Sequence, residues 1–218
     1  MSFDTLAPVY RPMEAVLAGG LLQRCRTAHL NQVCALPCRR ALVLGEGPGR
    51  FLVELLRQLP DIEIDCVEQS PAMIRQAQRR IERSGGDVSR VRFLAVDALD
   101  WVPQPQQFDL IATHFFLDCF PPDELGRLIS GIALGADAGT RWLVSDFCIP
   151  DHGWRRLRAR AIHGLMYRFF RIATGLRARR WTPPDAFLQA AGFELERRVT
   201  FSSGLLHSDL WVRGNCGG

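Results

Sequence analysis

The chain contains no lysine, because all 27 of the basic residues among its 218 are arginine. A protein without lysine cannot form a Schiff base through its own side chains, nor hold pyridoxal phosphate on one of them. It also cannot supply the lysine of the P-loop that cradles nucleotide phosphates. These classes of enzyme are therefore excluded.

Three further patterns are missing. No apolar run approaches the roughly 18 residues of a membrane-spanning helix, and the N-terminal stretch has an early acid but no apolar signal core. The seven cysteines form no CxxC pair, a spacing common in zinc sites. We therefore expect a cytoplasmic protein with reduced thiols and no metal site.

What is present is enough material for one folded core. Hydrophobic residues make up 47% of the chain and charged residues 23%, a balance typical of a globular protein rather than a disordered one. The length and the absence of a linker favour a single domain over residues 1–218.

From residue 41 onward, short apolar runs alternate with segments of helical periodicity. The runs predict strands over 41–44, 62–67, 91–96, 108–113 and 141–147, and Ser70-Pro71 supplies a cap and a first-turn proline for one of the helices. Two further β-rich runs, 193–201 and 205–213, are joined by only three residues, which requires an antiparallel hairpin.

This order predicts an α/β fold. We expect a doubly wound, seven-stranded, mostly parallel sheet of the Rossmann-like type, closed by the C-terminal antiparallel hairpin. Two segments lie outside the alternation, a helical cap over 5–38 and an arginine-rich insertion over 152–184.

Ligand-binding groups follow three successive expected strands, at the edge where doubly wound sheets bind their ligands. The first strand leads into a GxGxG turn made by Gly45, Gly47 and Gly49, which lets the backbone approach a ligand closely. Glu68 follows the second strand, where a carboxylate can accept both hydroxyls of a ribose. Asp97 follows the third, where an acceptor can meet an adenine amino group. The three positions together predict a nucleoside site.

With these features the chain resembles the class I S-adenosylmethionine-dependent methyltransferases of the small-molecule type. The resemblance spans about residues 3–213 and is carried by LVLGEGPGRF (42–51), VEQSPAMIRQA (67–77), VRFLAVDALDW (91–101), FDLIATHFFLDCF (108–120) and AAGFELERR (190–198). It implies a methyltransferase domain with S-adenosylmethionine as the cofactor.

The resemblance also implies which residues hold that cofactor. The glycine turn would line its methionine part, Glu68 would bind the ribose, Asp97 would bind the adenine, and Tyr10 would close over it. The full expected set is Tyr10, Gly45, Glu46, Gly47, Gly49, Glu68, Gln69, Met73, Asp97, Ala98 and Thr113. One position departs from the family pattern, because Val43 stands where an acid usually contacts the cofactor's amino group. Glu46 is the candidate replacement.

Two residues are candidates for catalysis. Methyl transfer from a sulfonium needs alignment and exclusion of water, and a base only where the acceptor must lose a proton. His114, directly after the fourth strand, is the first candidate base and Asp118 is the second. Asp146 and His152 lie in reach of the same cleft. The alternative interpretations are that His114 only braces the pocket, that Asp118 caps the following helix, and that the other two are polar loop residues.

The segment 152–184 contains nine of the arginines and no acid. Its apolar residues fall on one side of a helix at 100° per residue, which predicts a helical lid over an acceptor with an apolar or aromatic body and an anionic group. Contact with an acidic membrane surface through 154–180, an RNA phosphate track and a solvated arginine face are the alternatives.

The sequence therefore predicts S-adenosylmethionine-dependent methyl transfer to a small apolar or aromatic acceptor. An RNA-modifying methyltransferase is one alternative, which we rank lower because the excess of basic residues is confined to one segment. A non-catalytic binding protein with the methyltransferase fold is the other, and the Val43 departure is its main support.

Overall fold

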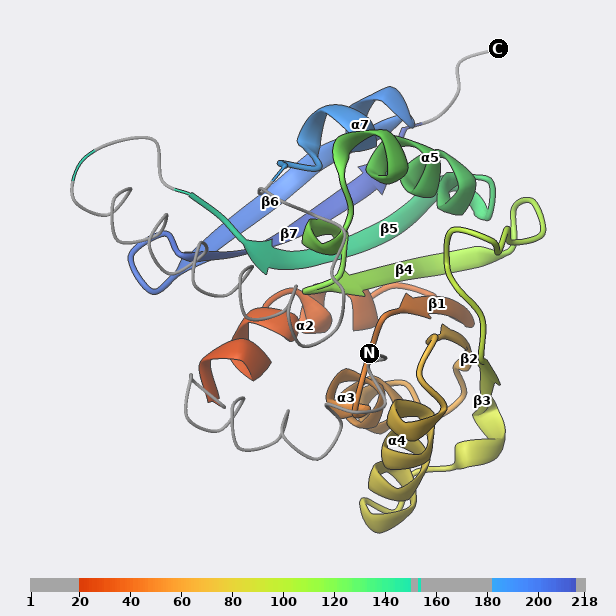
Figure 1. Cartoon of the computed structure of the whole chain (residues 1–218). Helices are drawn as coiled ribbons and strands as arrows, with labels where there is room; N and C mark the ends of the chain where they lie inside the picture. Colours follow the sequence, from red (N-terminus) through yellow and green to blue (C-terminus); the bar gives the residue numbers. More distant parts are fainter. Residues whose placement is uncertain (1–19, 150–152, 154–181, 215–218) are drawn as a thin grey trace.

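The computed structural model describes residues 20–149, 153 and 182–214. Over these residues the chain forms one seven-stranded sheet with helices on both faces (Figure 1). The strand order is β3-β2-β1-β4-β5-β7-β6. Tyr10, the rest of residues 5–19 of the expected N-terminal cap and most of the expected lid lie outside the described residues.

The parallel part of the sheet consists of β1 (Arg40–Leu44), β2 (Glu63–Val67), β3 (Val91–Leu94), β4 (Phe108–His114) and β5 (Ala136–Phe147). β6 (Phe193–Phe201) and β7 (Leu206–Arg213) form the predicted hairpin, and β7 pairs antiparallel with β5. The predicted Rossmann-like, mostly parallel sheet is therefore confirmed.

Two strand boundaries differ from the prediction by more than one residue. β5 begins at Ala136 rather than at 141, because Ala136 pairs with Phe108 across a register shift. The intervening residues include Gly139, and their own sequence has little tendency to form a strand. β3 ends at Leu94, two residues earlier than expected.

The helices are α2 (Leu30–Cys34), α3 (Arg50–Gln58), α4 (Pro71–Arg83), α5 (Pro122–Ala133) and α7 (Asp185–Ala190), with short 3-10 helices η1 (Val88–Arg90) and η2 (Leu117–Cys119). Residues 20–26 are also helical. α4 begins as predicted, since Ser70 Oγ accepts a hydrogen bond from the Met73 N–H at 3.2 Å and Pro71 occupies the first turn. Among the described helices, none is long and apolar enough to cross a membrane.

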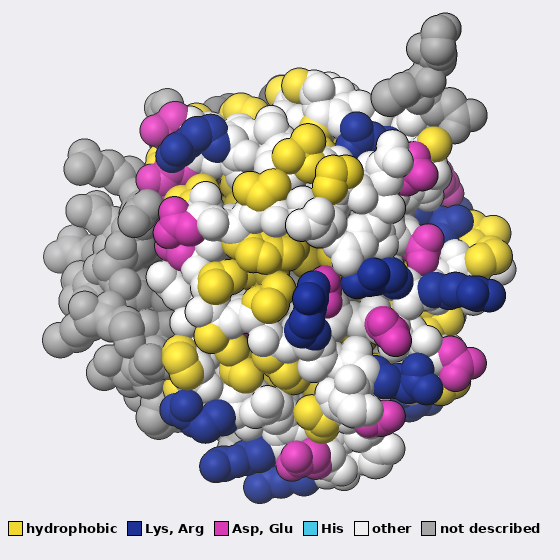
Figure 2. All heavy atoms as spheres, turned by 90° about the vertical axis from the view of Figure 1, so that its right-hand side faces the viewer, with side chains coloured by type: hydrophobic (Ala, Val, Ile, Leu, Met, Phe, Trp, Pro, Cys, Tyr) yellow, Lys and Arg dark blue, Asp and Glu magenta, His cyan; other side chains and the backbone are white. Residues whose placement is uncertain are grey.

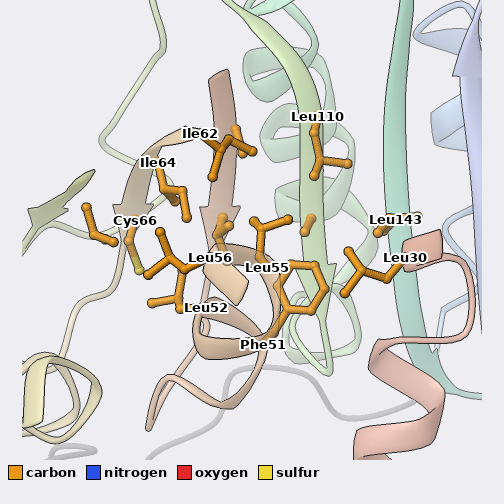
Figure 3. Close-up of a cluster of buried hydrophobic side chains, with 14 of the residues drawn as sticks. Leu30, Phe51, Leu52, Leu55, Leu56, Ile62, Ile64, Cys66, Leu110 and Leu143 are labelled. Carbon is orange, nitrogen blue, oxygen red and sulfur yellow. The ribbon is translucent and has the colours of Figure 1, made fainter. Parts of the chain in front are cut away.

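Each face of the sheet is covered by its own hydrophobic core. β1 is buried on both sides, as central parallel strands are, and its alternate residues point to opposite faces. Val43 packs with α3 and α4, and Leu44 packs with α5 and α7. Figure 3 shows the first of these cores, in which Phe51 points from α3 toward Leu30 of α2. The two helical layers leave the carboxyl ends of the parallel strands at one edge of the sheet.

Candidate cofactor-binding site

The glycine turn follows β1 at this edge, and its three glycines have positive φ angles. Their surroundings differ. Among the described residues, a Cβ added to Gly47 would meet no atom within 4 Å, whereas one on Gly49 would come within 2.7 Å of Ala77 in α4, and one on Gly45 would collide with the Phe116 ring. Gly47 therefore faces open space, and Gly49 allows α3 and α4 to pack closely.

Glu68 connects the turn to the start of α4. Its Oε2 accepts a hydrogen bond from the Gly47 N–H at 3.0 Å, and its Oε1 accepts one from the Ser70 N–H at 2.9 Å. A carboxylate has about four acceptor positions and can accept several hydrogen bonds at once. The contact also fixes the carboxylate beside the open space at Gly47.

Asp97 lies near the residue that follows Glu68. Gln69 Nε2 donates a hydrogen bond to Asp97 Oδ2 at 3.4 Å, and the Leu99 N–H donates to Oδ1 at 3.0 Å. Met73 and Ala98, the other two residues expected around the adenine, are both buried. The structure thus brings the polar residues after β2 and β3 together.

Glu46 turns inward beneath the glycine turn. Its Oε1 accepts a hydrogen bond from the Phe51 N–H at 2.7 Å, in the first turn of α3, whose N-cap is a glycine without a capping side chain. Its Oε2 is buried and has no hydrogen-bond partner in the described part of the chain. Burial raises the pKa of Glu46 to about 7, although the Arg26 charge opposes the shift. An acid therefore lies behind the turn, but it is supplied by position 46 and not by position 43.

His114 is buried at the end of β4. Its ring packs edge-on against the Phe51 ring, with 4.4 Å between centroids, and neither ring nitrogen has a hydrogen-bond partner within the described ranges. Burial, and then the Arg26 charge, lower the pKa of His114 to about 3, so the ring is neutral at neutral pH. The hydroxyl of the preceding Thr113 bonds within the fold, because its Oγ1 accepts a hydrogen bond from Trp142 Nε1 at 2.9 Å.

Asp118 and Asp146 form a pair of carboxyl groups. The Asp118 N–H donates to Asp146 Oδ2 at 3.1 Å, and the two side chains are hydrogen-bonded to each other. Burial raises the pKa of Asp118 to about 6, and burial together with the Asp118 charge raises the pKa of Asp146 well above its ordinary value. Such a pair holds one proton between two carboxylates over a wide pH range. Asp118 therefore contacts Asp146, and α5 begins without a side-chain cap.

A polar network beside this pair is absent from our sequence predictions. His207 lies opposite Asp146 in the β5–β7 pairing, and its Nδ1 is 2.9 Å from Asp209 Oδ2. Asp209 is fully buried and accepts two hydrogen bonds from Arg198, at 2.8 and 2.7 Å. The signal for it was available, because three polar residues in a row, 207–209, interrupt an otherwise apolar strand.

Arg26 is the other site residue that sequence reasoning missed. It is only 4% exposed, its guanidinium carbon lies 5.1 Å from the centre of the Phe115 ring, and its charge lowers the pKa values of both Glu46 and His114. It follows the predicted helical face by one residue, and nothing in that pattern marks it as buried.

The residues at this edge fit S-adenosylmethionine. Open space at Gly47, carboxylates at 68 and 97, and buried polar atoms without partners at Glu46 and His114 suit a nucleoside that carries an amino-acid group. A metal is a different case, since no cluster of three or more His, Cys, Asp or Glu side chains in the described ranges is arranged to hold one.

A sheet of this order with a glycine turn after β1 defines the class I methyltransferase fold. Residues 41–134 match a family model described as a methyltransferase domain. The chain is 33% identical over 115 residues to the demethylmenaquinone methyltransferase of Roseiflexus sp. (strain RS-1), covering 53% of this chain and 46% of that protein. It is 29% identical over 171 residues to the enzyme of that name from Thermus thermophilus, covering 77% and 70%.

A solved structure shows the same fold. It is the 1,6-didemethyltoxoflavin-N1-methyltransferase of Burkholderia thailandensis, with bound 1,6-didemethyltoxoflavin and S-adenosylhomocysteine, which matches with a TM-score of 0.65 and 20% identity over 94% of this chain and 84% of that one. Residues 41–134 are therefore similar to a methyltransferase domain, and the structural match shows the same fold. The chain spans less than half the length of three of the curated relatives it matches.

Proposed function

We propose that this protein transfers a methyl group from S-adenosylmethionine to a small-molecule acceptor. The observation that carries the proposal is the hydrogen bond from the Gly47 N–H to Glu68, beside open space and next to the Gln69–Asp97 contact. When bound, S-adenosylmethionine supplies a methyl group on a positively charged sulfur. The protein then has to align the acceptor and exclude water.

The cofactor-binding roles follow from the contacts. In this proposal Glu68 accepts hydrogen bonds from the ribose hydroxyls, and Asp97 accepts one from the adenine amino group. The Gly47 backbone lies against the cofactor, where a side chain would intrude. Met73 and Ala98 supply the apolar surface for the adenine ring.

Asp118, paired with Asp146, is the base that we propose for an acceptor with an O–H or N–H group. The acceptor proton passes to the carboxylate, the acceptor lone pair forms the bond to the methyl carbon, and the electrons of the broken carbon–sulfur bond stay on sulfur. A pKa of about 6 keeps the pair ready to take a proton at neutral pH. His114, with a pKa of about 3, is the weaker base and the alternative assignment.

A small acceptor suits the chain better than RNA. On the face drawn in Figure 2, the arginine side chains of the described residues are interspersed with Asp and Glu rather than gathered into one basic track. Nucleic-acid binding by backbone contacts requires such a track. The Burkholderia structure named above contains the small molecule 1,6-didemethyltoxoflavin, which supports the same class of acceptor.

Thermal unfolding with and without S-adenosylhomocysteine tests the proposal. Saturating ligand is expected to raise the Tm of the wild type and of the control Glu63→Ala, which changes an exposed residue at the start of β2. Glu68→Ala is expected to lose most of that increase. No increase in the wild type would favour the non-catalytic alternative.

A further inference from the structure

A hollow of about 510 Å³ lies between α3 and α4, and Gln23 of the helical residues 20–26 also lines it. This volume is typical of sites that bind small molecules. The two helices lie side by side (Figure 1) and pack closely where Gly49 meets Ala77. None of the described residues that line the hollow belongs to the set expected around S-adenosylmethionine, so the hollow is a second candidate site.

The spacing of residues along the two helices explains which side chains line the hollow. Along α4 the lining positions are 76, 79, 80 and 83, which are three or four residues apart and therefore share one helix face. Positions 50, 53 and 54 repeat that spacing along α3. A different face of α4 packs in the core, through Ala77 and Ile81. The sequence thus directs one largely polar face of each helix into the hollow.

The hollow carries an excess of positive charge, because four arginines and a single acid line it. The arginines are Arg50 from α3 and Arg79, Arg80 and Arg83 from α4. The acid, Glu54, accepts hydrogen bonds from Arg57 and Gln58, which are not among the described lining residues. Its charge is therefore balanced mainly by Arg57, and it does not neutralise the four lining arginines.

Helix electrostatics explain only part of this arrangement. The last turn of α4 contains Arg80 and Arg83, where a helix favours cations. Arg50 lies in the first turn of α3, where a helix favours negative charge instead. Arg79 and Arg83 are four residues apart, a spacing at which like charges repel. Within the described ranges neither of these two forms an ion pair. A bound anion would relieve both unfavourable placements.

Arg80 is held in place before any ligand binds. Its Nε donates a hydrogen bond to the Pro48 carbonyl oxygen at 2.8 Å, and its side chain is half-buried. Because this contact already fixes the guanidinium, less conformational entropy is lost when an anion binds to it. The planar group has five N–H donors in an arrangement that matches the oxygens of a phosphate.

We propose that this hollow binds a small molecule that carries a di- or triphosphate group. Arginine binds phosphate through paired, charge-assisted hydrogen bonds. Arg79 and Arg83 are about 6 Å apart along α4, and Arg50 lies on the other wall, so linked phosphates fit the spread of charge better than one phosphate. Val53 and the arginine stems supply apolar surface for an organic part. Because the four charges share one hollow and do not form a track, a small molecule is favoured over RNA.

Titration calorimetry on the full chain, with inorganic triphosphate as the probe, tests the inference. This probe carries no nucleoside that the proposed cofactor site could bind. The titrations are run with and without saturating S-adenosylhomocysteine. For the wild type we expect triphosphate to bind with the same affinity in both conditions, and orthophosphate to bind more weakly by about tenfold or more.

Arg79→Gln and Arg83→Gln are the decisive variants, because both arginines are exposed and their loss leaves the core intact. Each is expected to weaken triphosphate binding by about fivefold or more and to leave the Tm of the free protein nearly unchanged. Arg75→Gln is the matched control, since Arg75 is exposed on the same helix but is not among the described residues that line the hollow. It is expected to keep wild-type affinity. Glu54→Gln removes the one acid and is expected to tighten binding by about twofold.

An equal loss of affinity in Arg75→Gln and Arg83→Gln would overturn the inference, because the attraction would then be a general effect of charge. Absence of triphosphate binding by the wild type would overturn it too, as would competition with S-adenosylhomocysteine, which would place the probe in the cofactor site. A single-stranded RNA that binds more tightly than triphosphate and depends on Arg79 and Arg83 would replace the proposed ligand with a nucleic acid. Failure to bind S-adenosylhomocysteine, with triphosphate binding intact, would contradict the proposed function alone.

Discussion

The backbone N–H of Gly47 donates a hydrogen bond to Glu68 Oε2 across 3.0 Å. This contact joins the turn after β1 to the carboxylate after β2, two features separated by 21 positions in the chain. It holds the carboxylate beside the glycine with the most open surroundings in the turn. The proposed cofactor site therefore depends on the local shape of this turn.

Substitutions at two glycines of the turn are expected to separate binding from stability. Gly47→Ala places a Cβ in open space at a φ of 65°, so we expect a modest cost of about 1–2 kcal/mol in the free energy of unfolding. We also expect at least a tenfold loss of affinity for S-adenosylhomocysteine. Gly49→Ala forces a contact of 2.7 Å with Ala77 and is expected to cost more stability, about 3 kcal/mol. Urea unfolding and calorimetry measure both. Equal effects of the two variants would contradict their assigned roles.

The stability of the free protein is expected to depend on pH through Glu46. The folded-state pKa is raised to about 7 from an ordinary value of 4.5. The protonated form of Glu46 therefore stabilises the fold fully below the ordinary pKa. This stabilisation is lost as the pH rises through about 7, a change on the order of 3 kcal/mol in the free energy of unfolding. Glu46→Gln should lack this part of the pH dependence. Parallel curves of unfolding free energy against pH for the two proteins would show that Glu46 is not buried as described.

The proposed base predicts a pH–rate profile. Methyl transfer to an accepted phenol or amine should rise with pH through about 6, as the Asp118–Asp146 pair loses its first proton. Asp118→Asn should lower kcat by about 100-fold or more and remove that rise, because it removes the proton acceptor. Asp123→Asn changes an exposed acid in the first turn of α5 and is the control. A full rate in Asp118→Asn would return the assignment to His114.

The buried Asp209 carboxylate is expected to stabilise the hairpin. Burial opposes its ionisation, but the hydrogen bonds from Arg198 and His207 hold its pKa below the ordinary value. The stability that the ionised Asp209 carboxylate contributes is therefore present above its ordinary pKa, and it is lost as the pH falls through the lowered pKa. Asp209→Asn is expected to cost about 3 kcal/mol, since it leaves a buried pair broken. Asp185→Asn removes a half-exposed contact with Arg198 and is expected to cost less than about 1 kcal/mol.

The fold was predictable because its signals are local. Alternating apolar runs located most strand and helix ends to within a residue or two, and Ser70-Pro71 marked the start of α4. The early start of β5 was not predictable, since Ala136 joins the sheet only through pairing with Phe108. That contact belongs to the tertiary structure, and the intervening sequence is poor in strand-forming residues.

The placement of the candidate site residues was predictable where the topology of the sheet determines it, and not where the direction of a side chain does. Glu68 and Asp97 follow strand ends, so topology brings them to one edge. The inward turn of Glu46, the burial of Arg26 and the contact of Asp118 with Asp146 depend on packing between distant elements. Phe115 shows why, because its positive φ of 55° reorients the chain between β4 and η2 in a way that its own sequence does not indicate.

A crystal structure of the chain with S-adenosylhomocysteine tests the central claim most directly. We predict ribose hydroxyls on the Glu68 carboxylate, the adenine amino group on Asp97, and the nucleoside against the Gly47 backbone. Density for the nucleoside at any other place, or Glu68 and Asp97 without contact to it, would contradict the account.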